Sequence, residues 1–483
     1  MSHEHTDSYV SPLATRNASP QMQCIWSAQR KHATWRRLWL ALAEAEKDLG
    51  LPITDEQISD LKTHLDDIDF DKAAEYERQF RHDVMAHIHT FGDAAPKARA
   101  IIHLGATSQF VNCNTEIIQI RDSLRLTAGK CARVIDALAE KAVSYRALPT
   151  LGFTHYQPAQ PTTVGKRAAM WAADLAIVLE DIEYLLTNGI RLRGAKGATG
   201  TQASYLDLFD NDEDKVEQLD RLVVERMGFD PDTQRLLITG QTYPRVFDAR
   251  VLNVLATVAA VIHRICNDIR LLSNRKEVEE PFESSQIGSS AMPYKRNPMR
   301  CERATGLSRF VMSLPPNALN TTATQWLERT LDDSSNRRIV LPEAFLALDG
   351  ALDIMHNVSA GLIVNEKMVE ANLLAELPFM ATENILMEAV RQGADRQQVH
   401  EAIRRHSHEA GRAVKQEGKA NDLIDRLRGE PLLAGVDLDR VMEPARYIGL
   451  AARQADRFIV DTVDPIRKQY ASWLSDEAPT LKV

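Results

Sequence analysis

The sequence predicts an all-α protein built around a central bundle of long helices. Three separate segments place apolar residues in alternating steps of three and four, the spacing that gathers them on one face of a helix. At about 1.5 Å of rise per residue, each of these helices would span on the order of 30 Å or more. The chain has 22 glycines and 20 prolines among 483 residues, which leaves room for helices of that length. We expect three domains, over residues 1–107, 108–364 and 365–483.

The first domain, residues 1–107, is predicted to be a separate helical unit. Trp26, Trp35 and Trp39 fall in one amphipathic segment. The polar stretch from His103 to Ser108 reads as a hinge, so we place the first domain boundary there.

The second domain, residues 108–364, holds the three periodic segments. Because so elongated a bundle has much surface for its volume, we expect a homo-oligomer that buries apolar stripes between copies. Residues Arg191 to Tyr205 interrupt the helical pattern with glycines and threonines and predict a hairpin or an irregular loop. The periodic positions are Ile117, Ile120, Leu124, Cys131, Ile135, Leu138 and Ala142, then Val164, Ala168, Trp171, Leu175, Val178, Ile182 and Leu185, then Val251, Leu255, Val258, Ile262, Ile265, Ile269 and Leu272.

The third domain, residues 365–483, is predicted to consist of shorter helices. Turn signals at Gly393, at Gly418 and at Gly429-Glu430-Pro431 divide this part of the chain.

Composition argues against several functional classes. A formal charge of −9 disfavours non-specific nucleic-acid binding, which needs a net basic face. The five cysteines are odd in number, widely spaced and free of any Cys-x-x-Cys pair, which favours reduced thiols and gives no zinc signature. The first eleven residues lack the apolar run of a secretory signal, and the apolar stretch Val251–Ile262 is too short to cross a bilayer. We therefore expect a cytoplasmic protein without membrane or nucleic-acid partners.

Three polar clusters lie next to the long helices, at Gly105–Ser108, Thr154–Pro161 and Gly288–Pro298. Helix N-termini offer unpaired N–H groups and partial positive charge, so hydroxyl and amide groups there suit carboxylate binding. The alternative is structural: Thr107, Ser108 and Thr162 would be helix caps, and His155 a structural histidine.

The third cluster, Gly288–Pro298, is the most informative. Two prolines and a glycine break the helical pattern between two strongly periodic segments, which predicts a mobile loop that carries chemistry. An ordered loop of this length inside a helical domain is typical of a lid. A solvated basic loop is the alternative interpretation.

Taken together, the three clusters resemble the three signature regions of the fumarase and aspartase superfamily of lyases. Further segments resemble the adenylosuccinate lyase family in its eukaryotic-type form, and the similarity covers nearly the whole chain. These segments are Arg81–His87, Thr239–Tyr243, Gly288–Pro298 with Glu302-Arg303, and Trp326–Ser334. The resemblance implies the three-domain fumarase/aspartase-like fold, assembled as a homotetramer in which three subunits share each active site.

The resemblance also implies a β-elimination without metal or organic cofactor. Adenylosuccinate would give AMP and fumarate, and the succinylcarboxamide ribotide SAICAR would give AICAR and fumarate. By the same match Ser289 is the base, His155 the general acid, and Lys295 and Asn297 the groups that face the carboxylate whose charge grows. His82 would orient the acid or contact substrate, although the Arg81-His82-Asp83 triplet could equally be a structural ion pair.

The remaining site residues are assigned to substrate binding by the match. Arg329, Ser334 and Arg338 would bind the phosphate, a surface helix with ion pairs being the alternative, and Asp332 and Asp333 would be natural helix caps. Thr107, Ser108, Thr154 and Gln241 would bind the succinyl carboxylates. Further predicted contacts are Arg16, Asn17, Arg81, Asp83 and Arg303.

Two residues depart from the eukaryotic pattern. Asn17 stands where a tyrosine is usual, which removes a ring near the nucleotide, and Cys113 stands where an aspartate is common, which could alter a helix cap. Other functions remain open: a sister lyase acting on argininosuccinate, fumarate or aspartate, or a catalytically silent helical homologue. The phosphate-binding arginines favour the nucleotide enzyme over the sister lyases, and the presence of Ser289, Lys295 and His155 argues against a silent homologue.

Overall fold

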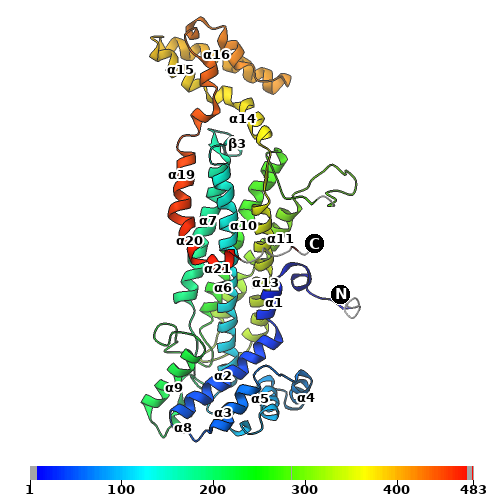
Figure 1. Cartoon of the computed structure of the whole chain (residues 1–483), viewed down its shortest axis with the longest axis vertical. Helices are drawn as coiled ribbons and strands as arrows, with labels where there is room; N and C mark the ends of the chain where they lie inside the picture. The colour runs from blue at the N-terminus through cyan, green and yellow to red at the C-terminus, as the bar shows by residue number, and fades with distance from the viewer. Residues whose placement is uncertain (1–7, 284–285, 476–480, 482–483) are drawn as a thin grey trace.

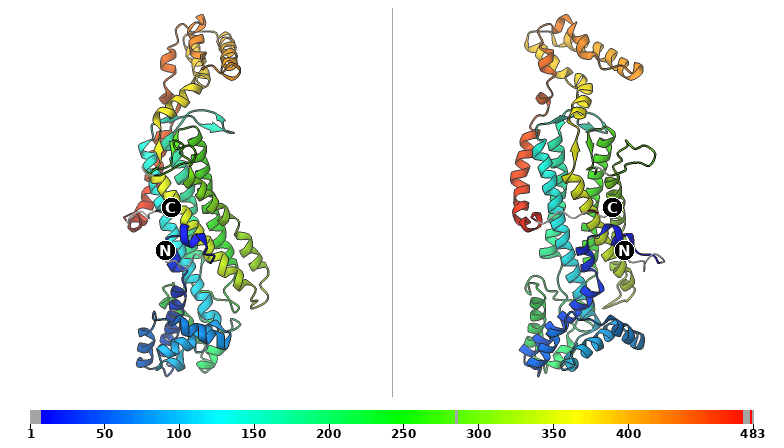
Figure 2. Two further views of the ribbon diagram at one scale, coloured as in Figure 1. Left: turned by 90° about the vertical axis from the view of Figure 1, so that its right-hand side faces the viewer. Right: turned by 45° about the vertical axis from the view of Figure 1, so that its right-hand side comes forward.

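The structure, a computed structural model, describes residues 8–283, 286–475 and 481. A bundle of long helices runs along the long axis, with a compact helical region at one end and a smaller helical module projecting from the other (Figure 1). The turned views show the same three-part arrangement (Figure 2). The predicted all-α fold with a central long-helix bundle is confirmed.

The helices of the N-terminal end pack around two tryptophans of α2. Trp35 and Trp39 are buried together with Phe91. The prediction that Trp26 belongs to the same segment is wrong, because Ser27 caps α2 by accepting the Arg30 N–H and so starts a new helix after Trp26. The elements at this end are α2 (Ala28–Asp48), α3 (Asp55–Thr63), α4 (Phe70–Phe80), α5 (Asp83–Ala94) and η3 (Arg99–Ile101); the preceding η2 (Leu13–Asn17) and α1 (Pro20–Ile25) pack on the central bundle.

The central bundle consists of α6 (Ser108–Ser144), α7 (Val164–Tyr184) continued by η4 (Leu185–Gly189), α10 (Val246–Asn274), α11 (Met299–Met312), α12 (Pro315–Ala323) and α13 (Asp333–Ala360). The three predicted periodic segments lie on α6, α7 with the start of η4, and α10, and every periodic position is buried. With 37 residues, α6 alone spans about 55 Å. The two ends of the bundle are therefore far apart.

Helix α10 is the one helix of the described chain long and apolar enough to cross a membrane. It contains the stretch Val251–Ile262 and extends well beyond it. Half of its most apolar window is buried inside the protein, where Val258, Ile262 and Ile269 are inaccessible to solvent. Packing in the bundle core accounts for its hydrophobicity.

The strands are short antiparallel pairs at the end of the bundle remote from α5. They are β1 (Pro149–Thr150) with β4 (Thr162–Thr163), β2 (Phe153–Thr154) with β3 (Gln157–Pro158), and β5 (Val278–Glu279) with β6 (Ile363–Val364). Of the two forms predicted for Arg191–Tyr205, the irregular loop is the one observed. Its single bridge, from Leu192 to Arg235, is parallel, and α8 (Ala203–Leu208) and α9 (Glu213–Arg226) follow it.

The projecting module has its own apolar core, and the predicted turns at Gly393, Gly418 and Gly429 all separate its helices. Its elements are α14 (Glu366–Met380), α15 (Thr382–Arg391), α16 (Arg396–Glu417), α17 (Leu423–Arg428), η5 (Pro431–Leu433), α18 (Leu438–Val441) and η6 (Pro444–Tyr447).

The chain then returns along the bundle as α19 (Ala451–Phe458), η7 (Ile459–Val463), α20 (Asp464–Gln469) and α21 (Ala471–Leu474). Trp473 lies against Gly129 in the middle of α6, where any larger residue would collide with the indole ring. Arg133 Nε donates to the Trp473 carbonyl at 2.7 Å. This segment, which follows residue 364, therefore packs on the central core.

One buried acid stands out in the N-terminal core. Glu46 on α2 is fully buried, and neither of its carboxylate oxygens has a hydrogen-bond partner among the described residues. Burial raises the pKa of Glu46 to about 9. Between its ordinary pKa of 4.5 and about 9, the folded state holds a proton that the unfolded state releases, so the free energy of unfolding falls as the pH rises.

We expect Glu46→Gln to remove this fall in the free energy of unfolding with rising pH. At pH 8 the variant should be more stable than wild type by as much as about 4 kcal/mol, whereas near pH 5 the difference should be small. Urea unfolding followed by circular dichroism at both pH values measures the effect. Glu225→Gln, at an exposed glutamate of α9, is the control and should show no such pH-dependent difference. Equal effects of Glu46→Gln at the two pH values would contradict the assignment.

Candidate active site

A polar cavity of about 760 Å³ opens at the N-terminal end of the bundle. Three helices, α5, α6 and α13, begin at its wall, so their free N–H groups and partial positive charges favour an anionic ligand. The structure brings many of the predicted site residues together here: Arg81, His82, Asp83, Thr107, Ser108, Gln241, Arg329, Ser334 and Arg338.

The hydroxyl groups at the start of α6 do not serve as helix caps. Thr107 occupies the cap position, yet its side chain makes no capping bond, and its Oγ1 instead accepts from Gln241 Nε2 at 3.5 Å. Ser108 Oγ lies 3.3 Å from His82 Nε2. The capping alternative also fails for Thr162, because Thr163 caps α7. Thr107 and Ser108 are thus available to a ligand.

His82 has its orientation fixed by the start of α5. Its Nδ1 accepts the Met85 N–H at 3.3 Å, which is the capping bond of that helix, and this places the ring proton on Nε2, toward Ser108. Nδ1 also lies 3.7 Å from Asp83 Oδ1. His82 is thus a structural cap whose other nitrogen faces the cavity.

Asp83 and Arg338 form an ion pair across the cavity wall, 3.3 Å apart. Burial opposes ionisation of Asp83, but the Val84 N–H and the cations Lys31 and Arg338 outweigh it and hold the pKa of Asp83 below its ordinary value. Ser334 and Arg338, one helical turn apart on α13, both face the cavity as predicted.

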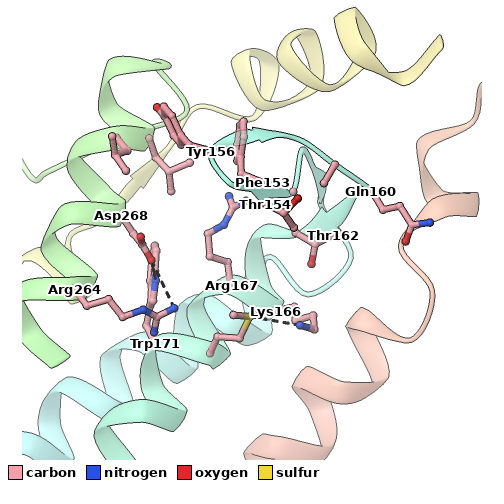
Figure 3. Close-up of a pocket in the computed structure, with 15 residues that line it drawn as sticks. Phe153, Thr154, Tyr156, Gln160, Thr162, Lys166, Arg167, Trp171, Arg264 and Asp268 are labelled. Carbon is pink, nitrogen blue, oxygen red and sulfur yellow. Dashed lines mark hydrogen bonds and ion pairs between the residues drawn. The ribbon is translucent and has the colours of Figure 1, made fainter. Parts of the chain in front are cut away.

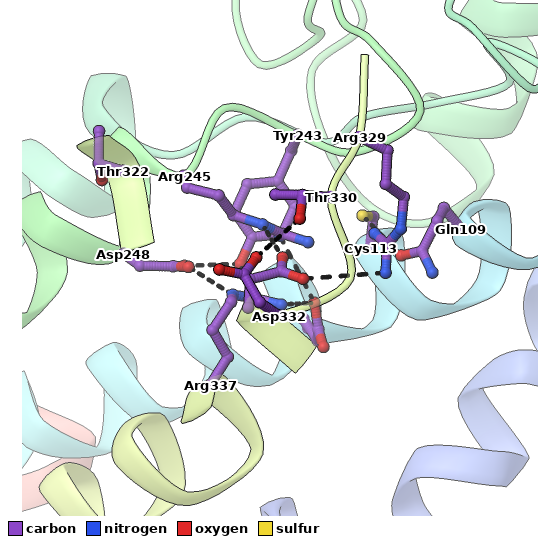
Figure 4. A network of polar contacts seen from close by, with 12 residues as sticks. Gln109, Cys113, Tyr243, Arg245, Asp248, Thr322, Arg329, Thr330, Asp332 and Arg337 are labelled. Atoms are coloured by element: carbon purple, nitrogen blue, oxygen red, sulfur yellow. Dashed lines mark hydrogen bonds and ion pairs between the residues drawn. The ribbon is translucent and has the colours of Figure 1, made fainter. Parts of the chain in front are cut away.

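A buried network of charged residues lies behind the start of α13 (Figure 4). Arg337 donates to Asp248 at 2.6 Å, to Glu116 at 2.9 Å and to the Tyr243 hydroxyl, which itself donates to Asp248 at 2.6 Å. Arg245 donates to Asp333 at 2.7 Å. The network holds the first turn of α13 in place.

The network also corrects the prediction that the two aspartates before Ser334 are helix caps. Asp332 makes no side-chain capping bond, and Asp333 is buried against Arg245. Cys113 does not alter a cap either. It lies inside α6, fully buried, with its Sγ 3.3 Å from Gln109 Oε1.

The second polar cluster forms a hairpin at the opposite end of α6. His155 and Tyr156 are its two turn residues, with φ of 53° and 55°, the left-handed values that a two-residue turn between β2 and β3 requires. This geometry exposes the His155 imidazole at the tip. A second pocket, of about 520 Å³, lies below the hairpin between α7 and α10 and includes Thr154 but not His155 (Figure 3).

The third cluster is a loop that projects from the bundle between β5 and α11 (Figure 1). Ser289 Oγ accepts the Met292 N–H at 3.2 Å, and Asn297 Nδ2 donates to the Gly288 carbonyl at 2.9 Å. Lys295 is exposed and forms no ion pair within the described chain. The loop thus presents a hydroxyl and a cation at its surface.

The base of this loop is held by ion pairs. Arg296 contacts Glu279 at 2.8 Å, and Arg300 contacts Glu283 at 2.5 Å. Farther along α11, Arg303 Nε donates to Asn17 Oδ1 at 2.9 Å and its guanidinium also reaches the Arg16 carbonyl. The unusual Asn17 therefore replaces a ring with an amide that binds Arg303.

The three clusters do not meet within one chain. Thr107 and the His155 hairpin lie at opposite ends of α6, about 55 Å apart along the helix. Gln241 lies just before α10, and the loop with Ser289 follows that helix. The 29 residues of α10 separate the two by about 43 Å along its axis. A site that uses all of them needs more than one copy of the chain.

Sequence reasoning missed several residues that line the first cavity. Gln109 and Asn112 follow Ser108 on the first turns of α6. Because Asn112 lies four residues after Ser108, both share one face of the helix, and this spacing could have indicated Asn112. Glu77, on α4, had no such signal. Among the described residues, no group of three or more His, Cys, Asp or Glu side chains could hold a metal ion.

Comparison with known proteins agrees with this geometry. A family model described as "Lyase" matches residues 17–313, and one described as "Adenylosuccinate lyase C-terminus" matches residues 378–458. The adenylosuccinate lyase of Schizosaccharomyces pombe is 50% identical over 99% of this chain and 100% of its own length. That of Schistosoma mansoni is 49% identical over 97% of this chain and 98% of its own.

Solved structures with low sequence identity share the fold. A 3-carboxy-cis,cis-muconate lactonizing enzyme from Pseudomonas putida superposes with a TM-score of 0.80 at 23% identity, covering 95% of this chain and 99% of its own. A fumarate lyase from Mesorhizobium sp. BNC1 gives 0.77 at 22% identity, covering 94% and 99%. With full-length relatives near 50% identity, the chain belongs to the adenylosuccinate lyase family of the fumarase and aspartase superfamily.

Proposed function

We propose that the protein cleaves adenylosuccinate to AMP and fumarate, and SAICAR to AICAR and fumarate, by β-elimination. The observation that carries the proposal is the cavity in which Arg329, Ser334 and Arg338 surround the start of α13, in a chain whose full-length relatives are adenylosuccinate lyases. A nucleotide phosphate needs such a combination of guanidinium groups and a helix N-terminus. A sister lyase with a substrate that lacks phosphate does not.

The chemistry has two demanding steps. A proton must leave the carbon next to a carboxylate, and the C–N bond on the adjacent carbon must break. We assign the first step to Ser289, which becomes an effective base only when the loop closes and excludes water, and the second to His155, which protonates the departing nitrogen. Each contributes roughly 10²- to 10⁴-fold. Lys295 and Asn297 stabilise the growing negative charge, and this supplies much of the remaining acceleration.

The phosphate assignment predicts that Arg338→Ala weakens substrate binding. Loss of a charge-assisted hydrogen bond should raise KM about 10- to 100-fold and leave kcat nearly unchanged. Steady-state kinetics with adenylosuccinate measure both constants, and Arg457→Ala, at an exposed arginine of α19, is the control. With the dephosphorylated nucleoside as substrate, wild type and Arg338→Ala should differ little. An unchanged KM for the nucleotide would remove Arg338 from the phosphate site.

We further propose that the active protein is a homotetramer with shared sites. The separation of the three clusters within one chain supports this. So does α7, where Met170, Ile177 and Tyr184 are exposed at intervals of seven residues and form an apolar stripe on the outside of the bundle.

Subunit mixing tests the shared site. Ser289→Ala removes the proposed base, and Ser334→Asp places a negative charge where the phosphate binds, so each variant alone should be inactive. When both are dissociated, mixed and reassociated, about a quarter of the sites should combine an intact loop with an intact cavity. Recovered activity near that fraction is the expected result. If each site came from one chain, no mixture would be active, and each variant treated alone provides the baseline.

An absorbance assay of the purified protein tests the reaction itself. We expect turnover of adenylosuccinate and SAICAR, with argininosuccinate and fumarate as the comparison substrates. Activity on argininosuccinate alone would favour the sister lyase, and activity on none of the four would favour a silent homologue.

A further inference from the structure

A partly buried loop lies directly behind the two segments that carry Thr107 and Gln241. This loop, residues 193–205, precedes and enters α8, and its Arg193 and Lys196 are almost inaccessible to solvent. Gly194, Gly197 and Gly200 have φ of 74°, 74° and 86°, which only glycine adopts readily. The loop can therefore fold tightly and approach other backbone segments closely.

The loop holds the Gln241 segment through Arg193 and Gly200. Arg193 Nη2 donates to the Gly197 carbonyl at 2.8 Å and to the Gly240 carbonyl at 3.2 Å. Gly200 packs so closely against the Thr239 carbonyl that any side chain there would collide with it. Because Gly240 immediately precedes Gln241, these contacts fix where the Gln241 amide points.

The same loop holds the Thr107 segment through its other end. Ser204 Oγ donates to the Gly105 carbonyl at 2.6 Å. The Tyr205 ring packs closely against Gly105, where an added Cβ atom would come within 2.7 Å of Tyr205 Cδ1. Gly105 lies two residues before Thr107. One loop thus contacts both segments whose side chains, Gln241 and Thr107, meet at 3.5 Å in the cavity.

The loop is itself firmly anchored. Asp220 on α9 accepts the Ala195 N–H at 2.8 Å and pairs with Lys196 and Arg235. Asn114 on α6 exchanges two hydrogen bonds with the Gly194 backbone, at 2.9 and 3.1 Å. Because the loop is held in this way, any shift of its backbone would move the Gly105 and Gly240 segments that it contacts.

We propose that Ser204 and Arg193 are positioning residues for the carboxylate-binding part of the site. They set the distance and angle between Thr107 and Gln241, and so tune the affinity for the four-carbon dicarboxylate without affecting the nucleotide end. The proposal rests on the function proposed above, in which these two side chains bind the succinyl carboxylates.

The test compares the affinities for the two products. Ser204→Ala should raise the dissociation constant of fumarate about fivefold, the effect of losing one hydrogen bond, and leave that of AMP unchanged. Ser204→Thr keeps the hydroxyl and should restore fumarate binding. Ser313→Ala removes an equivalent hydroxyl-to-carbonyl bond at the end of α11 and is the matched control. Arg193→Lys, which keeps the charge but not the two-carbonyl contact, should also weaken fumarate selectively.

Binding is read by calorimetry and product inhibition on the full-length protein, together with the melting temperature. An unchanged fumarate constant in Ser204→Ala would overturn the proposal. So would a parallel loss of fumarate and AMP binding with a lowered melting temperature, which indicates a merely structural role. If Arg193→Lys does not fold, the Ser204→Ala and Ser204→Thr variants alone test the proposal. Because calorimetry needs no turnover, failure of the proposed reaction remains distinguishable from failure of this proposal.

Discussion

Ser289→Ala is expected to lower kcat by roughly 10²- to 10⁴-fold, the contribution of a general base. The fold should not change, because the Ser289 hydroxyl lies on a projecting loop and its contact within the described chain is the Met292 N–H. KM should change little, since the hydroxyl acts on the carbon acid and not on the phosphate or carboxylates. Absorbance at saturating adenylosuccinate measures kcat.

The neighbouring serine provides the control for this experiment. Ser290 is exposed and adjacent in the same loop, so Ser290→Ala tests whether any loss comes from a disturbed loop or from the missing hydroxyl. We expect Ser290→Ala to retain most of the wild-type activity. Wild-type rates in Ser289→Ala would remove the base from the mechanism, and equal losses in both variants would assign the effect to loop structure.

Arg337→Met is expected to cost about 3–5 kcal/mol of folding stability. The substitution leaves the carboxylates of Asp248 and Glu116 without their main cationic partner in a buried site, and removal of one member of a buried ion pair is far more costly than loss of an exposed one. The midpoint of urea unfolding should fall accordingly. Activity should fall too, because the first turn of α13 carries Ser334 and Arg338.

Arg404→Met is the matched control for the stability effect. Arg404 pairs with Glu401 on the surface of α16, where both side chains are more than half exposed, and such pairs contribute at most about 1 kcal/mol. A small difference between the two variants would show that the network in Figure 4 is not a determinant of stability.

The fold was predictable where burial follows a simple period. On α6, α7 and α10 the positions that follow the period are apolar and buried, so the spacing alone identified the bundle seams. The start of α13 was expected at Asp332 and Asp333, but its place in the bundle core was not, because its buried face also carries charge: Asp349 and Asp353 pair with the buried Lys130 at 2.5 and 2.8 Å. Polar groups in the core erase the hydrophobic period that sequence reasoning depends on.

The site was only partly accessible to sequence reasoning. The residues around the cavity at the start of α13 could be named because their segments resemble a known family, and the structure places Arg329, Ser334 and Arg338 together. Nothing in the sequence distinguishes the fully buried Arg193 from a solvated arginine, because its environment is created by loops far away in the chain. The convergence of His155 and Ser289 on that cavity, as proposed above, requires an assembly, which spacing along one chain does not encode.

The return of the chain along α6 has a consequence for inherited or engineered truncations. Helices α20 and α21 are not an appendage: Trp473 lies against Gly129, and Arg467 contacts Asp136 and Glu140 on the same helix. A premature stop codon even a few residues before Trp473 would remove the side chain that covers Gly129 on the longest helix. The uncovered surface would make the protein prone to aggregation and degradation. Affinity tags and fusion partners are therefore better attached beyond this contact than substituted for it.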